Sequence, residues 1–161
     1  MYLIALTVIH VAISLIGIGS GFVVRYGLLT SQRFEGWTRL FLGTTVATSL
    51  TGFLFPFEGF TPGDTVGVIS LVVLSVAILA RYRYNLLGAW RTWYVVTAVM
   101  ALYLNVFVLV VQLFEKVPAL KALAPTHSEP PFQIVQLAIL VIFIALGFRV
   151  AIGFEKERRT A

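Results

Sequence analysis

The chain has 161 residues, of which 59% are hydrophobic and 12% charged, with a formal net charge of +5 and a mean hydropathy of +0.95. Soluble domains average about 45–50% apolar and about 25% charged residues, so this composition excludes an ordinary water-soluble domain. It also excludes a disordered chain, which needs many polar residues. Because the apolar residues lie in long runs, we expect an all-α, polytopic membrane protein whose single transmembrane domain covers 1–161.

Five stretches approach the 20 or so apolar residues that a membrane-spanning helix needs. In chain order they cover residues 2–24, 38–57, 65–82, 92–114 and 131–154. The third is the shortest, and if it only re-entered the membrane, four spans would remain and the topology after it would invert. The segment 115–130 is expected to form an outer loop with a short interfacial helix, which Pro118 begins and Pro125 ends.

The basic residues test this count, because Lys and Arg at the ends of spans are retained on the cytoplasmic side. Ten lie in the first connection, the third connection and the tail: Arg25, Arg33, Arg39, Arg81, Arg83, Arg91, Arg149, Lys156, Arg158 and Arg159. The other connections hold two, Lys116 and Lys121. With five spans the ten basic residues all lie on one side of the membrane, whereas four spans would divide them between the two sides. The sequence therefore predicts five spans, with an outside N-terminus and a cytoplasmic C-terminus.

Small residues form stripes that suit helix packing in lipid, where they allow backbones to approach closely. Gly17 and Gly21 form a GxxxG pair in the first span, and Gly43 with Ala47 forms a looser pair in the second. We assign these four positions to helix packing. The same stripe on the first span would also suit assembly of several copies of the chain.

Polar residues inside the apolar runs define the candidate site, because they are costly in lipid and usually face the bundle interior. At 1.5 Å per residue, His10 and Ser49 lie about 12 Å below the outer boundary, and Asn105 and Thr48 about 13 Å below it. Gln112 and Gln136 lie within about 5 Å of the same boundary. The sequence therefore predicts an outer-half cluster of His10, Thr48, Ser49, Asn105, Gln112 and Gln136. The alternative is that these residues only bond helices together.

Most chemistry has no support in the sequence. The chain has no cysteine, His10 and Ser49 lack a membrane carboxylate to orient the histidine, and no spacing of His, Asp and Glu suggests a metal site. No basic patch interleaved with aromatic residues points to nucleic acid. One redox alternative stays open, a haem b site ligated by His10 and the loop residue His127. We expect no enzyme, no catalytic residue and no cofactor.

Two functional hypotheses remain. The first is a non-catalytic membrane component, or a binder of a small lipophilic ligand in a cleft of the outer half beside the aromatic segment 53–57. The second is a subunit of a small oligomeric channel or transporter, because five helices with short loops seldom enclose a pathway alone. The bilayer, further copies of the chain and a membrane partner protein are the expected partners.

Three segments of the chain read TTVATSLTGFLFPF at 44–57, LYLNVFV at 102–108 and ALAPTHSEPPF at 122–132. They resemble a family of small polytopic inner-membrane proteins of Gram-negative bacteria to which no activity is assigned. The resemblance implies a multi-pass protein of the cell inner membrane. It implies no functional residue.

Overall fold

The computed structural model describes residues 2–30, 32, 34–56 and 62–160, and among these the side chains of all but 62 and 151–160. This part of the chain is helical and contains no strand. The elements are α1 (Tyr2–Leu29), α2 (Glu35–Gly52), α3 (Pro62–Ile78), the π-helical turn η1 (Leu79–Arg83), α4 (Trp90–Lys116), α5 (Pro118–Leu123) and α6 (Pro130–Thr160).

Four segments of the described chain are long and apolar enough to cross a membrane. They are Tyr2–Leu29, Gly63–Arg83, Trp90–Lys116 and Pro130–Val150. The chain is therefore a helical protein of the multi-pass membrane class, in contact with a lipid bilayer. The short predicted span 65–82 belongs to this set. The predicted span 38–57 does not, because α2 contains the charged residues Glu35 and Arg39 and several hydroxyl side chains, which together lower its hydropathy. Its predicted end, Phe57, lies outside the described residues.

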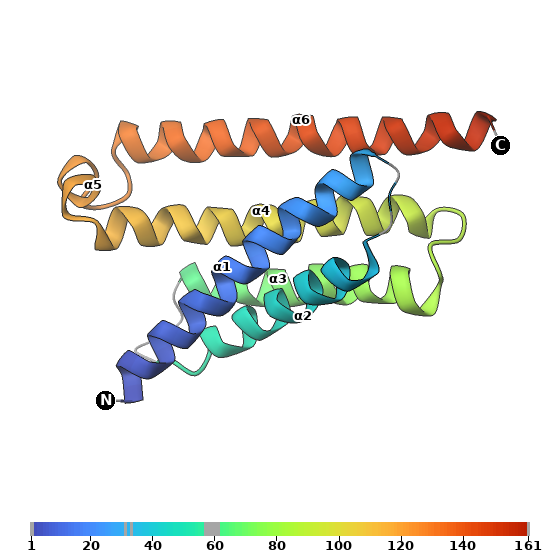
Figure 1. Ribbon diagram of the computed structural model, residues 1–161. Coiled ribbons are helices and arrows are strands. Elements are labelled where there is room, and N and C mark those ends of the chain that lie inside the picture. Colours follow the sequence, from blue (N-terminus) through green and yellow to red (C-terminus); the bar gives the residue numbers. More distant parts are fainter. Residues whose placement is uncertain (1, 31, 33, 57–61, 161) are drawn as a thin grey trace.

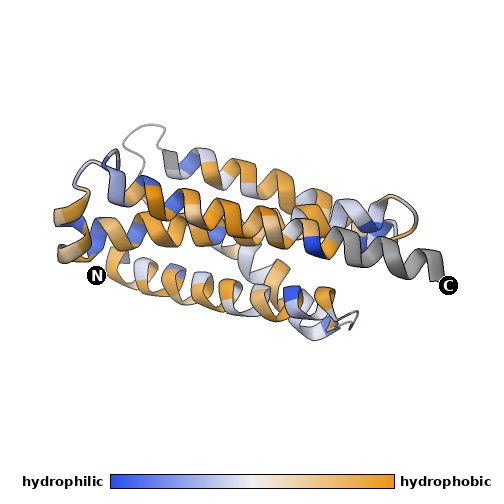
Figure 2. Ribbon diagram, turned by 90° about the horizontal axis from the view of Figure 1, so that it is seen from above, coloured by the Kyte–Doolittle hydropathy of each residue, from blue (hydrophilic) through white to orange (hydrophobic). Residues whose placement is uncertain are grey.

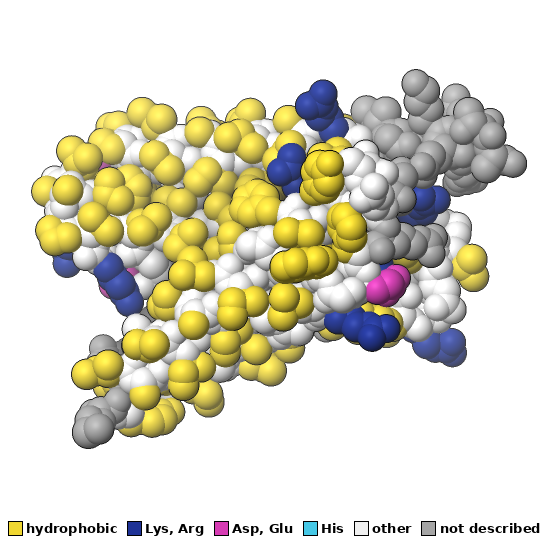
Figure 3. Space-filling model, viewed as in Figure 1, with side chains coloured by type: hydrophobic (Ala, Val, Ile, Leu, Met, Phe, Trp, Pro, Cys, Tyr) yellow, Lys and Arg dark blue, Asp and Glu magenta, His cyan; other side chains and the backbone are white. Residues whose placement is uncertain are grey.

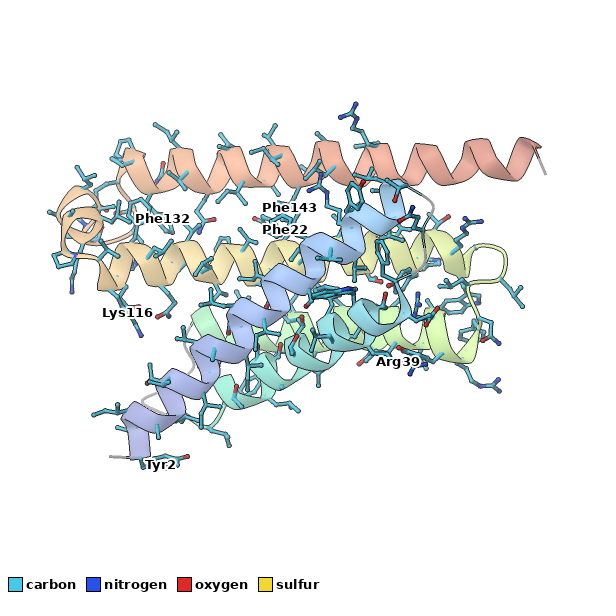
Figure 4. The ribbon with its side chains drawn as sticks, in the orientation of Figure 1. Tyr2, Phe22, Arg39, Lys116, Phe132 and Phe143 are labelled. Carbon is cyan, nitrogen blue, oxygen red and sulfur yellow. The ribbon has the colours of Figure 1, made fainter. Side chains whose placement is uncertain are left out.

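The long helices run back and forth along one axis, so the N- and C-termini lie at opposite ends of the bundle (Figure 1). We call the end with the 30–34 and 84–89 connections the basic end, and the end with α5 the α5 end. α1 leans across α2 and α4, while α6 lies alongside α4. The ring centroids of Phe22 on α1 and Phe143 on α6 are 6.4 Å apart (Figure 4).

α4 is the central helix. Half of the residues in the most apolar stretch of α4 are buried, against 11% of those in the corresponding stretch of α6. α4 contacts α1, α3, α5 and α6. Tyr94, Leu102 and Ala101 of α4 are almost fully enclosed, together with Phe41 of α2 and Leu74 of α3. A smaller apolar cluster of Val110, Phe114 and Ala124 joins α4 to α5.

The outer surface is largely apolar. Figure 2 shows hydrophobic residues along the middle of the helices and hydrophilic ones mainly towards their ends. In the space-filling view most Lys and Arg side chains lie near the two ends of an otherwise hydrophobic face (Figure 3). Exposed apolar residues such as Ile4, Ile134 and Phe148, each at least 65% exposed, are suited to contact with lipid.

Candidate functional site

The α1–α2 interface contains a line of polar contacts. His10 Nδ1 lies 2.8 Å from Thr51 Oγ1. Ser14 Oγ donates to the carbonyl of His10 at 2.8 Å and lies 3.4 Å from Thr48 Oγ1. The later residue of α1 therefore contacts the earlier residue of α2, so the two helices are antiparallel. The ring of Phe55 packs edge-on against His10, with centroids 5.5 Å apart.

Asn105 extends this line to α4. Its Nδ2 donates a hydrogen bond to Thr45 Oγ1 at 3.2 Å, and both side chains are buried. A Cβ atom on Gly17 would lie 3.2 Å from Thr44 Oγ1 and 3.5 Å from Asn105 Nδ2. Glycine therefore lets α1 approach closely where α2 and α4 meet. We call His10, Ser14, Thr45, Thr48, Thr51 and Asn105 the polar seam.

The remaining residues of the predicted cluster lie apart from this seam or bond elsewhere. Ser49 is buried and donates to the carbonyl of Thr45 at 3.0 Å. Gln136 on α6 donates from Nε2 to the carbonyl of Phe107 at 3.2 Å, and its buried Oε1 has no hydrogen-bond partner. Gln112 is half-buried on α4. The structure thus joins His10, Thr48 and Asn105 to the α1–α2 interface, and the two glutamines belong to the α4 and α6 side.

The four residues that the sequence assigned to helix packing differ in how closely other helices approach them. Gly21 lies at the tightest approach, since a Cβ atom there would be 2.6 Å from Leu102 Cδ1 and 2.9 Å from Phe41 Cε2. Gly17 lies one turn away on the same face. Gly43 has no atom within 4 Å of its Cβ position, and Ala47 is half-buried, with its carbonyl accepting a hydrogen bond from Thr51 Oγ1.

The loop before α6 is held by its own side chains. The Glu129 carboxylate accepts hydrogen bonds from Thr126 Oγ1 at 2.9 Å and from the backbone nitrogens of Thr126 and Ser128 at 3.2 and 3.1 Å. A slight loss of hydration raises the pKa of Glu129, but these hydrogen bonds outweigh it and leave the pKa below its usual value. His127, at φ 61°, packs its ring 5.1 Å from that of Phe132. This arrangement stabilises a turn.

A second polar region lies at the basic end, around Arg81. Arg81 sits in the π-helical turn η1, and such turns often occur at functional positions. Its side chain is only 9% exposed, its Nη2 lies 2.7 Å from Glu35 Oε1, and its Cζ lies 5.3 Å from the ring centroid of Tyr94. Beside it is a cavity of about 50 Å³.

No protein-family model, curated protein or solved structure matches this chain. The described residues contain no group of three or more His, Asp or Glu side chains able to hold a metal ion.

From the sequence, Arg81 was expected only as a basic residue at the end of a span, and its contacts with Glu35 and Tyr94 were not predicted. Glu35, Arg81 and Tyr94 lie on three different elements, α2, η1 and α4, and nothing in the apolar pattern of the third span indicates a π-helical turn. One signal was present, since aromatic and basic residues alternate from Arg81 to Tyr84 and Tyr94 follows in the next span.

Proposed function

We propose that the chain crosses the membrane five times, with α2 as the additional span. Two contacts support this. Glu35 at the start of α2 pairs with Arg81 at the end of the span Gly63–Arg83, and Phe53, just after α2, packs on Gly67 near the beginning of that span. α2 therefore extends alongside a spanning helix. Its 18 residues measure about 27 Å, close to the hydrocarbon thickness of about 30 Å.

The hydroxyl groups of α2 are compatible with such a position because the helix satisfies them itself. Thr44 donates to the carbonyl of Leu40 at 2.7 Å, Ser49 to that of Thr45 at 3.0 Å, and Thr51 to that of Ala47 at 2.8 Å. A polar group bonded within the protein avoids most of the cost of leaving water. Low hydropathy is therefore a weak argument against a crossing here.

The proposed orientation has the α5 end outside and the basic end in the cytoplasm, in the inner membrane of a bacterial cell. Arg25, Arg39, Arg81, Arg83 and Arg91 belong to the basic end, whereas Lys116 and Lys121 belong to the α5 end. Basic flanks are retained in the cytoplasm during insertion. The polar seam then opens from the middle of the bilayer towards its outer half.

The function we propose is that of a non-catalytic membrane component whose polar seam fastens α2 to α1 and α4. The observation that carries it is that His10, Ser14 and Asn105 each reach a hydroxyl on another helix. Interhelical hydrogen bonds of this kind contribute modestly to association of helices in lipid, averaging about 0.6 kcal/mol each. A binder of a small lipophilic ligand beside Phe53 and Phe55 belongs to the same proposal. A subunit of an oligomeric channel or transporter is the alternative.

Single cysteines test the five crossings directly, because the natural chain has none. Thr30→Cys precedes α2, and Leu54→Cys, at a side chain 57% exposed, follows it. If α2 crosses, a membrane-impermeant maleimide added to spheroplasts labels Leu54→Cys, and it labels Thr30→Cys only after permeabilisation. Equal labelling of both from one side would remove α2 from the crossings.

A second experiment tests the functional part. The purified protein in liposomes is expected to give no ion flux above empty liposomes and no Soret absorption, while His10→Ala and Asn105→Ala lower its thermal midpoint. Flux that disappears in these variants at unchanged stability would favour the channel subunit. A Soret band lost in His10→Ala would favour the haem protein.

A further inference from the structure

The cavity at the basic end is lined by residues of α1, α2, η1, α4 and the connections between them. Its lining residues of polar character are Gln32, Thr38, Arg81, Arg91 and Tyr94. At 10–15 Å³ for each water position, its volume of about 50 Å³ accommodates about four waters. A phosphate group, with one phosphorus and four oxygens, is of comparable size.

The donors at this cavity suit an oxyanion. A guanidinium has five N–H donors in a planar fork that matches phosphate oxygens, and two arginines, Arg81 and Arg91, line the space. Glu35 binds Arg81 through one nitrogen. The Glu35 side chain is 54% exposed, whereas that of Arg81 is 9% exposed, so the cation is held inside and its carboxylate partner lies at the rim.

Tyr94 supplies the observation that points to a ligand. Its side chain is 1% exposed, it lines the cavity, and its hydroxyl oxygen has no hydrogen-bond partner. The Thr38 and Arg81 side chains lie close enough to interact with this hydroxyl, but neither makes a hydrogen bond of normal length and angle with it. A buried hydroxyl without a partner destabilises a fold. A ligand oxygen that accepts its proton would remove that cost.

A second unpartnered donor lies nearby. Arg25 Nε is buried without a hydrogen-bond partner, and Arg25 lines a small hollow that shares Val24 and Leu28 with the cavity. This end also carries exposed aromatic side chains of the kind found where a membrane meets water. They are Tyr26, Trp37, Tyr82, Tyr84 and Trp93. The cavity therefore lies at the level where phospholipid headgroups are found.

We propose that this cavity binds a phosphate group, either that of an anionic phospholipid headgroup or free inorganic phosphate, through Arg81, Arg91 and the Tyr94 hydroxyl. Glu35 at the rim opposes the anion and competes with it for Arg81. This site is at the end opposite the polar seam and does not depend on the function proposed for it.

Binding at this site can be followed by the fluorescence of the tryptophan residues. All three, Trp37, Trp90 and Trp93, lie at the starts of α2 and α4, so their fluorescence is sensitive to the basic end. In one arm the detergent-solubilised protein is titrated with inorganic phosphate. In the other it is titrated with phosphatidylglycerol in mixed micelles, with dioleoylglycerol as the lipid that lacks phosphate. We expect a saturable change in at least one arm, and the arm that responds identifies the source of the phosphate.

Tyr94→Phe is the decisive variant because it removes only the unpartnered hydroxyl. It should weaken phosphate or phosphatidylglycerol binding about tenfold, the effect of one hydrogen bond to a charged group. Without ligand its thermal midpoint should equal or exceed that of the natural protein. Tyr103→Phe, which removes a phenol hydroxyl further along α4, is the matched control and should bind like the natural protein.

Glu35→Gln tests the sign of the ligand charge. Removing the rim carboxylate should raise the affinity, because an anion no longer faces Glu35 and competes with it for Arg81. Lower affinity in this variant would contradict an anionic ligand. No saturable response in either arm, or equal affinity in Tyr94→Phe and the natural protein, would overturn the proposal and leave a water-filled cavity only.

Discussion

Gly21 is the position at which the packing of α1 is most sensitive to one added methyl group. A Cβ atom there would lie 2.6 Å from Leu102 Cδ1 and 2.9 Å from Phe41 Cε2. Both neighbours are enclosed, at 2% and 1% exposure, so neither can move into open space. Overpacking of this kind costs about 1–3 kcal/mol. The steric effect of Gly21→Ala should therefore lower the free energy of unfolding by that amount, before the higher helix propensity of alanine is counted.

Compensation comes from the backbone, because alanine is favoured over glycine inside a helix by about 1 kcal/mol. Gly19→Ala isolates this contribution, since no atom lies within 4 Å of a Cβ at Gly19. The gain is common to both variants and cancels in their comparison. Gly21→Ala should therefore be less stable than Gly19→Ala by about 1–3 kcal/mol, the overpacking cost alone.

Unfolding of the detergent-solubilised protein, followed by tryptophan fluorescence during titration with sodium dodecyl sulfate, measures this difference. Gly17→Ala gives an intermediate point, because its Cβ would approach Thr44 Oγ1 only to 3.2 Å. Equal stability of Gly19→Ala and Gly21→Ala would show that the α1–α2–α4 contact is wrong.

Three further predictions concern other parts of the fold. A double-mutant cycle of Thr45→Val and Asn105→Leu, measured by the same unfolding titration, should give a coupling of about 0.6 kcal/mol; no coupling would contradict the bond between α2 and α4. Gly88→Ala should lower the stability by about 1 kcal/mol, because Gly88 has φ +54° with open space around it, and an unchanged midpoint would refute that backbone conformation. The lowered pKa of Glu129 means that its carboxylate stabilises the fold above the ordinary glutamic acid value of 4.5 and that this contribution is lost as the pH falls through the lowered pKa. The thermal midpoint of the natural protein should thus exceed that of Glu129→Gln at pH 7, the excess should disappear in acid, and a constant difference would argue against the Thr126–Glu129 turn.

The helices were predictable from the sequence to a large extent because long apolar runs in lipid allow little else. The boundaries differ mainly at basic ends. α1 continues past Arg25 to Leu29, since a long basic side chain can remain helical while its charged group reaches the membrane surface. The number of crossings was harder to predict, because α2 has the length of a span but is less apolar than the four candidate spans, and its crossing is the proposal made above.

The sequence indicated which polar residues of the candidate site lie at similar depth, but not which of them form hydrogen-bonded pairs. Similar depth grouped His10 with Ser49 and Thr48, whereas in the structure His10 contacts Thr51 and Ser14 contacts Thr48. The rotation of α2 about its axis decides between these hydroxyls, and a pattern with hydroxyls on several faces does not define that rotation. Arg81 was missed for a similar reason, because the π-helical turn changes which residue faces the interior.

The hydrogen bond between Thr45 and Asn105 joins residues 60 positions apart, which has a consequence for biogenesis. When the nascent α2 leaves the ribosome, α1 is already available to cover it, but the amide that later binds Thr45 has not yet been translated. With α2 crossing the membrane as proposed, the first two helices enter the bilayer as a hairpin that is incompletely paired. Its assembly is completed only when the fourth helix arrives, so a polypeptide that stops after α3 should be a preferred target for membrane quality-control proteases.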